Sequence, residues 1–329
     1  MAKTLSLCMI VRDEEANLDA CLASVAGAVD EIVVSDTGSV DRTKEIARAH
    51  GAIVVERAWT RDFAAARNHA IEHATKDWVL ILDADETIDT AARPLLRAAI
   101  ATTSAAALKT RTRNLLPPGE IAAFNEIVQT RLFRRDPAHR YVGKVHEQIT
   151  GSILDAGGTI AEADAELIVL HHGYRSETAQ GKDRGARNLA LLITQNEETP
   201  GDPFILYNLG ATFKNMRKHD EARRYLVEAL EADRGALTSG VRERLYTTLA
   251  QLALGAHDDA LAAEYALATL AIGPANPLAL QILALGLVSK GDVAGAVDAF
   301  RRLRRSPALA PNLAADIDKV LAALAAGGK

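Results

Sequence analysis

The chain has 329 residues, 48% of them hydrophobic, so it is long enough for a sizeable core, and its length favours two domains over one. The formal net charge of −5 argues against a surface built mainly to neutralise nucleic-acid phosphate, and we expect no nucleic-acid partner. Two cysteines are too few to predict a disulfide framework or a cysteine zinc site.

The amino-terminal apolar stretch is short. It runs from Thr4 to Val11 and ends at the charged segment Arg12 to Glu15. A signal peptide or a membrane-spanning helix needs a longer apolar segment. We therefore expect a soluble, cytoplasmic protein with no membrane span.

Short apolar runs then alternate with helical patterns. Runs of strand length, rich in Val, Ile and Leu, lie at 5–11, 31–35, 52–55 and 78–82. Segments with helical spacing lie between them at 18–26, 43–50 and 64–74. That order predicts βαβ units and a largely parallel sheet.

The pattern is less regular from residue 105 to residue 169. Turn signals occur at 117–119 and 157–158, and β-like pieces occur at 106–113 and 129–133. We expect a mixed sheet there. After the segment 199–203 the composition shifts to helix formers, which predicts a boundary between an α/β domain at 1–199 and an all-α domain at 200–329.

The carboxyl-terminal part contains internal repeats. Small and large residues recur at the offsets of a tetratricopeptide repeat, and Ala262 and Ala296 are 34 positions apart, the period of that repeat. The three frames are Leu209, Gly210, Phe213, Ala222, Leu226 and Ala229; Leu249, Ala250, Ala262, Ala266 and Pro274; Leu283, Ala284, Leu287, Gly291, Ala296 and Phe300. We expect three degenerate repeats and a terminal helix at about 313–326, with an ordinary Ala-rich bundle as the alternative.

Stacked helix pairs form extended concave surfaces. The repeats are therefore candidates to bind another protein or a second copy of this chain. In the second case the protein would be a homo-oligomer.

Acidic residues follow the apolar run at 78–82. Asp83 and Asp85 are two positions apart, so in an extended segment both side chains point to one side. Strand ends of parallel sheets form the rim where ligands bind. Carboxylate oxygens suit Mg²⁺ or Mn²⁺, which bridge diphosphate oxygens. Alone, the Asp-x-Asp spacing is weak evidence, because acidic strand ends also cap helices.

A second acidic strand end occurs at Asp36, after the run at 31–35. A turn with Gly38 follows, and then a helix start for which Asp41 or Ser39 is the expected N-cap. We expect Asp36 at the same edge of the sheet as Asp83.

Seven segments carry a likeness to a known family: Met9 to Glu15, Val34 to Thr43, Asp62 to Ala70, Leu82 to Glu86, Arg131 to Arg135, Tyr141 to Glu147 and Leu170 to Tyr174. Together they resemble family 2 glycosyltransferases of GT-A fold. More narrowly, they resemble a bacterial subgroup with a tetratricopeptide tail that includes glycopeptide S-glycosyltransferases. The likeness covers nearly the whole chain, most strongly residues 4–90. One departure is Asp13, where the family commonly has Asn.

The resemblance implies roles for individual residues. The backbone of Ile10, Val11 and Arg12 and the side chain of Asp36 would contact the base and ribose of a nucleotide, typically uridine. Arg67 and Asn68 would lie over the nucleotide or its diphosphate, and a guanidinium suits an anionic group. Asp83, with Ala84 beside it, would face the ribose or donor sugar, and Asp85 would bind the metal.

Two further site residues come from the later segments. His171 is the candidate that completes the metal site, ahead of His172, and imidazole is compatible with Mn²⁺. Direct displacement with inversion at the sugar carbon needs a base that takes the acceptor's proton. Glu147 is our choice for it and Asp136 is the alternative.

We interpret the chain as a glycosyltransferase that uses Mn²⁺ or Mg²⁺ and a nucleotide-sugar donor, with a UDP-sugar as the first candidate. The acceptor expected first is a protein or peptide, followed by a saccharide or lipid-linked acceptor. Two rival hypotheses are a nucleotidyltransferase and a non-catalytic repeat scaffold with a degenerate nucleotide-binding domain. The phosphate loop of nucleotidyltransferases, rich in Gly and bearing a Lys, is not seen near the first strand.

Overall fold

The chain forms two compact units in the computed structural model, which describes residues 2–164, 166–172 and 180–327. The first unit consists of residues 1–115 and 126–176, and the second of residues 116–125 and 177–329. The chain therefore passes from one unit to the other more than once, because a ten-residue segment of the amino-terminal half belongs to the second unit.

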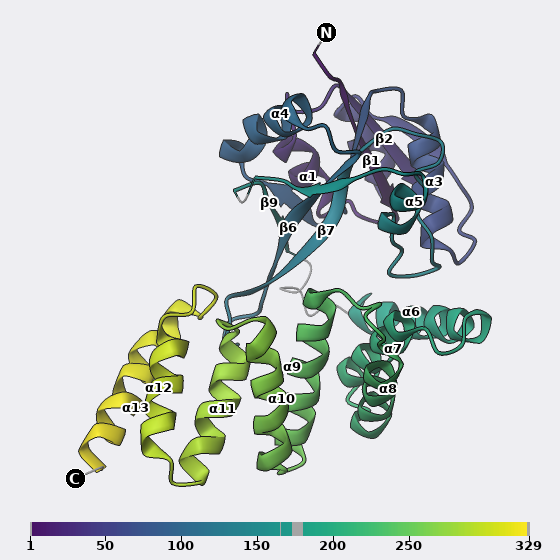
Figure 1. The fold of residues 1–329 in the computed structure, drawn as a ribbon. Helices are drawn as coiled ribbons and strands as arrows, with labels where there is room; N and C mark the ends of the chain where they lie inside the picture. The colour runs from purple at the N-terminus through teal and green to yellow at the C-terminus, as the bar shows by residue number, and fades with distance from the viewer. Residues whose placement is uncertain (1, 165, 173–179, 328–329) are drawn as a thin grey trace. The chain divides into compact units, whose positions relative to one another are not determined.

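The first unit is built on a mixed sheet (Figure 1). Its strands lie in the order β3-β2-β1-β4-β7-β6-β9-β5, with β8 beside β6. They are β1 (Leu5–Val11), β2 (Glu31–Asp36), β3 (Ile53–Glu56), β4 (Trp78–Ile81), β5 (Glu86–Ile88), β6 (Ala107–Leu115), β7 (Phe124–Arg134), β8 (Ile160–Glu162) and β9 (Ile168–His171).

Strand direction changes in the middle of this sheet. The pairs β1–β2, β1–β4 and β2–β3 are parallel, as the βαβ pattern predicts. Strand β7 pairs with β4 in the antiparallel sense, and β5 pairs with β9 in the same way. Both the expected parallel half and the expected mixed part are confirmed.

Helices cover both faces of the sheet. They are α1 (Leu18–Ser24), α2 (Thr43–Ala49), α3 (Phe63–His73), α4 (Arg93–Thr102) and α5 (Thr150–Asp155), with a short 3₁₀ turn, η1 (Thr90–Ala92), before α4. Because alternate strand residues face opposite sides, Leu7 and Leu80 pack in one core with α1, α2 and α4, whereas Cys8 and Val79 pack in another with α3 and α5.

The second unit is helical. Its helices are α6 (Gln180–Glu198), α7 (Pro203–Asn215), α8 (His219–Ala232), α9 (Ser239–Gly255), α10 (Asp259–Ile272), α11 (Pro277–Ser289), α12 (Val293–Arg304) and α13 (Ala314–Gly327), and η3 (Pro311–Leu313) precedes α13. Neighbours in sequence pack as antiparallel pairs, visible for α9 to α12 in Figure 1.

The repeat frames identified in the sequence lie where these pairs meet. Ala222, Ala262 and Ala296 are fully buried, and the large frame residues Leu226 and Phe300 are buried beside them. Small residues therefore allow close approach of the paired helices, as expected for this repeat. The predicted fold class, a mixed α/β sheet followed by all-α helical repeats, is confirmed.

The expected boundary between residues 199 and 200 falls between α6 and α7. The contacts assign α6 to the second unit, together with residues 116–125. Those residues form the tip of the β6–β7 hairpin and pair with the segment before α13, because Ala123 N donates to Ala308 O at 2.9 Å and Ala310 N donates to Ile121 O at 3.0 Å. Within the described residues, no helix has the length and hydropathy needed to cross a membrane.

Gly210 gives a test of the repeat packing. A β-carbon at this position would lie 2.6 Å from Leu226 Cγ, so Gly210→Ala must push α7 and α8 apart. We expect a loss of about 1–3 kcal/mol in the stability of the helical unit. Denaturant unfolding followed by far-ultraviolet circular dichroism measures it.

Gly286→Ala is the matched control. Gly286 is also a buried helical glycine, but a β-carbon there would be 3.7 Å from its nearest neighbour, an ordinary contact. Because alanine favours the helix, this variant should be at least as stable as the parent. Equal stability of the two variants would contradict close packing at Gly210.

Candidate active site

The turn after β4 presents two carboxylates at the carboxyl edge of the parallel strands. Asp83 and Asp85 follow Ile81, the last residue of β4, and Glu86 begins β5. The turn is closed twice: Glu86 N donates to Asp83 O at 3.0 Å, and Asp83 N donates to Glu86 Oε2 at 2.8 Å. The backbone of the acidic turn is therefore held by its own last residue.

A buried ion pair fixes Glu86. Arg131, on β7, donates from Nη1 to Glu86 Oε2 at 2.8 Å and from Nη2 to Oε1 at 2.6 Å. Glu86 and Arg131 are 1% and 7% exposed. Burial raises the pKa of Glu86 to about 7 even though Arg131 opposes that rise. This two-pronged bond ties the acidic turn to the neighbouring strand.

Arg67 joins two carboxylates from different parts of the chain. It lies on α3, whose N-cap Asp62 accepts from Ala65 N. Its Nη2 donates to Asp83 Oδ1 at 2.8 Å, and its Nε donates to Glu147. Burial acts to raise the pKa of Asp83, but Arg67 and Arg131 hold it well below its usual range. Asp83 is therefore ionised.

One donor of Arg67 is unused. Its Nη1 is buried and has no hydrogen-bond partner within the described part of the chain. A buried N–H that lacks a partner is costly, so such a group commonly marks a place for a ligand or ion. The guanidinium also lies over the ring of Tyr141, with 5.6 Å between its carbon and the ring centroid.

Asp85 and His171 face each other beside this cluster. His171 Nε2 lies 3.2 Å from Asp85 Oδ2, and His172 N donates to Asp85 O at 2.9 Å. Burial lowers the pKa of His171, but Asp85 and its acidic neighbours outweigh that effect and raise it. The imidazole of His172 instead contacts Thr87 Oγ1 through Nε2, at 2.9 Å. Gly173 and Tyr174 lie outside the described residues.

The donor set suits an oxygen-preferring cation only in part. Among the described residues, no group of three or more His, Cys, Asp and Glu side chains is placed to hold a metal ion. The two expected metal ligands, Asp85 and His171, do lie together, with 3.2 Å between Asp85 Oδ2 and His171 Nε2. Mg²⁺ commonly takes one or two carboxylates from the protein and its other ligands from water and substrate phosphates, so the Asp85 carboxylate fits Mg²⁺, whereas the imidazole of His171 fits a transition metal such as Mn²⁺ better.

Asp36 and Asn68, two of the residues expected to contact the nucleotide, bond backbone groups of nearby loops. Asp36 is 1% exposed, and its Oδ1 accepts from Gly38 N at 3.1 Å and from Ser39 N at 3.0 Å. The side chain of Asn68 bonds both backbone groups of Tyr141, at 2.9 Å each. The carboxylate and the amide thus hold loops in this structure, and their contact with a nucleotide stays a prediction.

The first two strands end in interlocked loops. Val11 O accepts from Thr37 N at 3.0 Å, and Asp41 accepts from Glu15 N at 3.0 Å. Ile10 is partly exposed, Val11 is buried and Arg12 is exposed. Ala84, in the acidic turn, is buried. The expectation that Asp41 or Ser39 is an N-cap was wrong, because α2 begins at Thr43 and its N-cap is Arg42.

The two candidate bases lie in different places. Glu147 has a side chain only 9% exposed and meets Arg67. Asp136 is in an exposed turn after β7, where it accepts from Ala138 N. Because Arg134 pairs with Trp78, the first residue of β4, Asp136 lies toward the edge of the sheet opposite the acidic turn. This geometry favours Glu147 over Asp136 as the candidate base.

The sequence patterns gave no role to three residues that organise this site: Glu86, Arg131 and Asn114. Glu86 and Arg131 stood inside the motif segments without an assigned contact, and nothing in their spacing links positions 45 residues apart. Asn114, on β6, accepts at Oδ1 from His171 Nδ1 at 2.8 Å. Only strand register brings these partners together.

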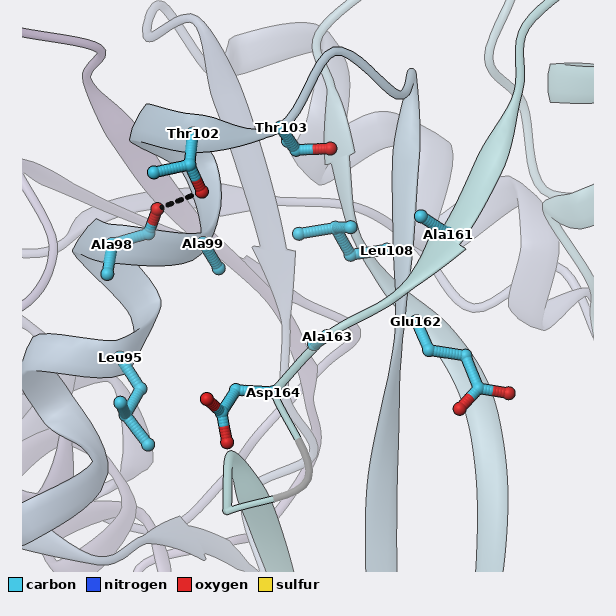
Figure 2. Close-up of a pocket in the computed structure, with 10 residues that line it drawn as sticks. All are labelled: Leu95, Ala98, Ala99, Thr102, Thr103, Leu108, Ala161, Glu162, Ala163 and Asp164. Carbon is cyan, nitrogen blue, oxygen red and sulfur yellow. Dashed lines mark hydrogen bonds between the residues drawn. The ribbon is translucent and has the colours of Figure 1, made fainter.

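A separate surface pocket of about 460 Å³ lies between α4 and β8 (Figure 2). Leu95, Leu108 and Ala163 contribute apolar walls, and Thr102 at its edge is bonded to Ala98 O. Its lining includes neither Arg67 nor the carboxylates of the acidic turn, so it is not the candidate active site.

Comparison with known proteins shows a likeness to a family over the sheet-forming part of the chain. Residues 6–152 match the model of glycosyl transferase family 2. A TPR repeat-containing protein of Synechococcus elongatus is 36% identical over 234 residues, which cover 70% of this chain and 57% of that protein. The prophage-derived glycosyltransferase SunS of Bacillus subtilis is 27% identical over 237 residues, which cover 69% and 53%.

The chain thus spans a little over half the length of these curated relatives. Among solved structures, glucosyl-3-phosphoglycerate synthase of Mycobacterium tuberculosis is 16% identical with a TM-score of 0.42, covering 59% of this chain and 79% of that one. The TPR protein YrrB is 17% identical with a TM-score of 0.38, covering 45% and 72%.

Replacement of Arg131 tests the buried pair. Arg131→Met leaves Glu86 buried without its partner, so the first unit should lose about 3–5 kcal/mol of stability. Both tryptophans, Trp59 and Trp78, lie in this unit, so their fluorescence during denaturant unfolding reports on it.

The double variant Glu86→Leu/Arg131→Met removes both charges and should recover part of that loss. Arg111→Met is the control, because Arg111 is paired with Glu126 at a side-chain exposure of 41% and should cost no more than about 1 kcal/mol. A similar cost for Arg111 and Arg131 would mean that burial does not set the strength of this pair.

Proposed function

We propose that this chain, whose residues 6–152 match the model of glycosyl transferase family 2, transfers a sugar from a nucleotide-sugar donor to an acceptor nucleophile, with inversion at the sugar carbon. A UDP-sugar is the first candidate donor. The acceptor class proposed first is a protein or peptide, and a saccharide is the second.

The observation that carries this proposal is the position of Arg67. Its guanidinium contacts Asp83 and Glu147 at once, and its buried Nη1 has no partner within the described residues. A diphosphate oxygen is the kind of acceptor that satisfies such a donor. Arg67 would bind the donor's diphosphate while it still contacts the two carboxylates.

Asp85 and His171 would hold the divalent cation, Mn²⁺ or Mg²⁺. When bound, the cation would offset negative charge on the departing diphosphate. Asp83, with Ala84 next to it, would contact the ribose or the donor sugar. The backbone of Ile10 to Arg12, with Asp36 and Asn68 behind it, would shape the nucleotide pocket.

Glu147 would act as the base that takes the proton of the acceptor. Its ion pair with Arg67 holds it near the donor side of the site. General-base assistance by a positioned carboxylate contributes about 10²–10⁴ in rate. The helical repeats would bind either the acceptor or a second copy of the chain, because stacked helix pairs expose an extended surface.

Nucleotide binding is the direct test. Calorimetric titration of the full chain with UDP, GDP and ADP, each with Mn²⁺, with Mg²⁺ and with chelator, should give metal-dependent binding of UDP. Asp85→Ala removes a proposed direct ligand of the metal. The metal-dependent affinity of this variant for UDP should therefore fall by more than the roughly 10–100-fold that is typical when a residue supporting a metal ligand is removed.

Asp155→Ala is the control for this titration, because Asp155 is an exposed carboxylate of the same unit at the end of α5. Absence of binding for all three nucleotides would contradict the proposal and favour a scaffold. Tight binding of a nucleoside triphosphate in preference to UDP would favour a nucleotidyltransferase.

Glu147→Gln tests the base. The substitution keeps the size and an acceptor oxygen for Arg67 but removes the basic carboxylate, so kcat should fall by about 10²–10⁴ while the Kd for UDP changes little. Asp136→Asn should leave both values near those of the parent. Equal losses in kcat and UDP affinity would instead indicate a binding role for Glu147.

A further inference from the structure

Asn114, His171 and Glu86 lie in one row across three neighbouring strands. Asn114 on β6 is opposite His171 on β9 in a parallel pair, and His171 is opposite Glu86 on β5 in an antiparallel pair. Residues directly opposite in a sheet share a face. The register therefore places the Asn114 amide beside the His171 ring.

The His171 ring is held at both nitrogens. Its Nδ1 lies 2.8 Å from Asn114 Oδ1, and its Nε2 lies 3.2 Å from Asp85 Oδ2. An amide oxygen only accepts hydrogen bonds, so the proton of this contact belongs to Nδ1. Nε2 is then the nitrogen directed at Asp85.

We propose that Asn114 is a positioning residue that fixes the ring orientation and tautomer of His171, so that Nε2 of His171 and the Asp85 carboxylate bind one divalent cation. This inference rests on the proposed metal-dependent function. Histidines that ligate metals generally donate their other ring N–H to an acceptor, and that acceptor sets which nitrogen binds the metal.

Burial makes this contact specific. Asn114 is only 6% exposed, so little water is present to replace its amide oxygen as the acceptor. The side chain of Asp85 is 14% exposed and that of His171 21% exposed, so their facing atoms stay within reach of a cation while the Asn114 side of the ring is enclosed. A metal site that draws two side chains from the described residues depends strongly on the orientation of each.

The test measures Mn²⁺ affinity of the full chain at saturating UDP, by the electron paramagnetic resonance signal of free Mn²⁺. Asn114→Ala should weaken Mn²⁺ binding by about 10–100-fold, the usual effect of removing such a supporting acceptor. Asn114→Asp keeps an acceptor oxygen and should stay within about threefold of the parent.

Asn208→Ala is the matched control. Asn208 is also a buried asparagine, 6% exposed, but it lies on α7 in the helical unit, where its amide donates to Phe204 O. Its loss should leave Mn²⁺ affinity unchanged. An equal effect of Asn114→Ala and Asn208→Ala would overturn the inference, because it would reflect general destabilisation.

A second measurement needs no substitution. Nitrogen-15 resonances of histidine in the complex with UDP and Mg²⁺ should show the proton of His171 on Nδ1, and a proton on Nε2 would overturn the inference. This readout also keeps the inference testable if Asn114→Ala does not fold.

The outcomes separate this inference from the proposed function. If His171→Ala and Asp85→Ala lose Mn²⁺ affinity but Asn114→Ala does not, the positioning role fails and the metal site stands. If the parent chain binds neither Mn²⁺ nor UDP, the proposed function fails and the inference fails with it.

Discussion

Charge compensation by two buried guanidinium groups is the constraint on which the site depends. Arg131 pairs with Glu86, and Arg67 pairs with both Asp83 and Glu147. Removing carboxylates from water costs several kcal/mol each unless they are paired and hydrogen-bonded. The acidic turn can therefore lie in a largely buried place only because α3 and β7 bring these two arginines to it.

The change of strand direction at β4 makes this compensation possible. The parallel strands deliver the acidic turn to one edge of the sheet, as open α/β sheets generally do. Antiparallel β7 then runs back alongside β4, which brings Arg131 beside the acidic turn. Strand β9 adds His171 next to β5. A wholly parallel sheet would place its strand ends at this edge but would not bring mid-strand residues of β7 to it.

Local pattern was sufficient to predict the parallel half and the repeats. The apolar runs that became β1 to β4 have strand length and are separated by helical spacing, and the alanines of the repeats keep their offsets. The position of Asp83 and Asp85 at the end of a strand could be predicted for the same reason, because they directly follow an apolar run of strand length. Asp36 was correctly expected at a strand end, but its burial by the Gly38 turn has no signature in spacing.

The remaining features depend on pairing between distant segments. Arg131 with Glu86, and Asn114 with His171, meet through strand register, which single-sequence periodicity does not specify. The assignment of residues 116–125 to the helical unit is of the same kind, because backbone bonds from Ile121 and Ala123 to a segment near residue 309 carry it. Turn chemistry predicted a bend at Gly119 but not what the hairpin tip would pair with.

The described side chains of the site do not balance one another's charge. Arg131 and Glu86 cancel, Arg67 faces two carboxylates, and Asp85 is paired only with His171 among the contacts described above. Two guanidinium groups thus face four carboxyl groups, so acidic groups outnumber basic ones in this cluster. Under the proposed function, a divalent cation would offset that excess, and an anionic diphosphate would then contact both the cation and Nη1 of Arg67, which has no partner within the described residues. In that case cation and diphosphate would favour each other's binding at this site, because their charges are of opposite sign.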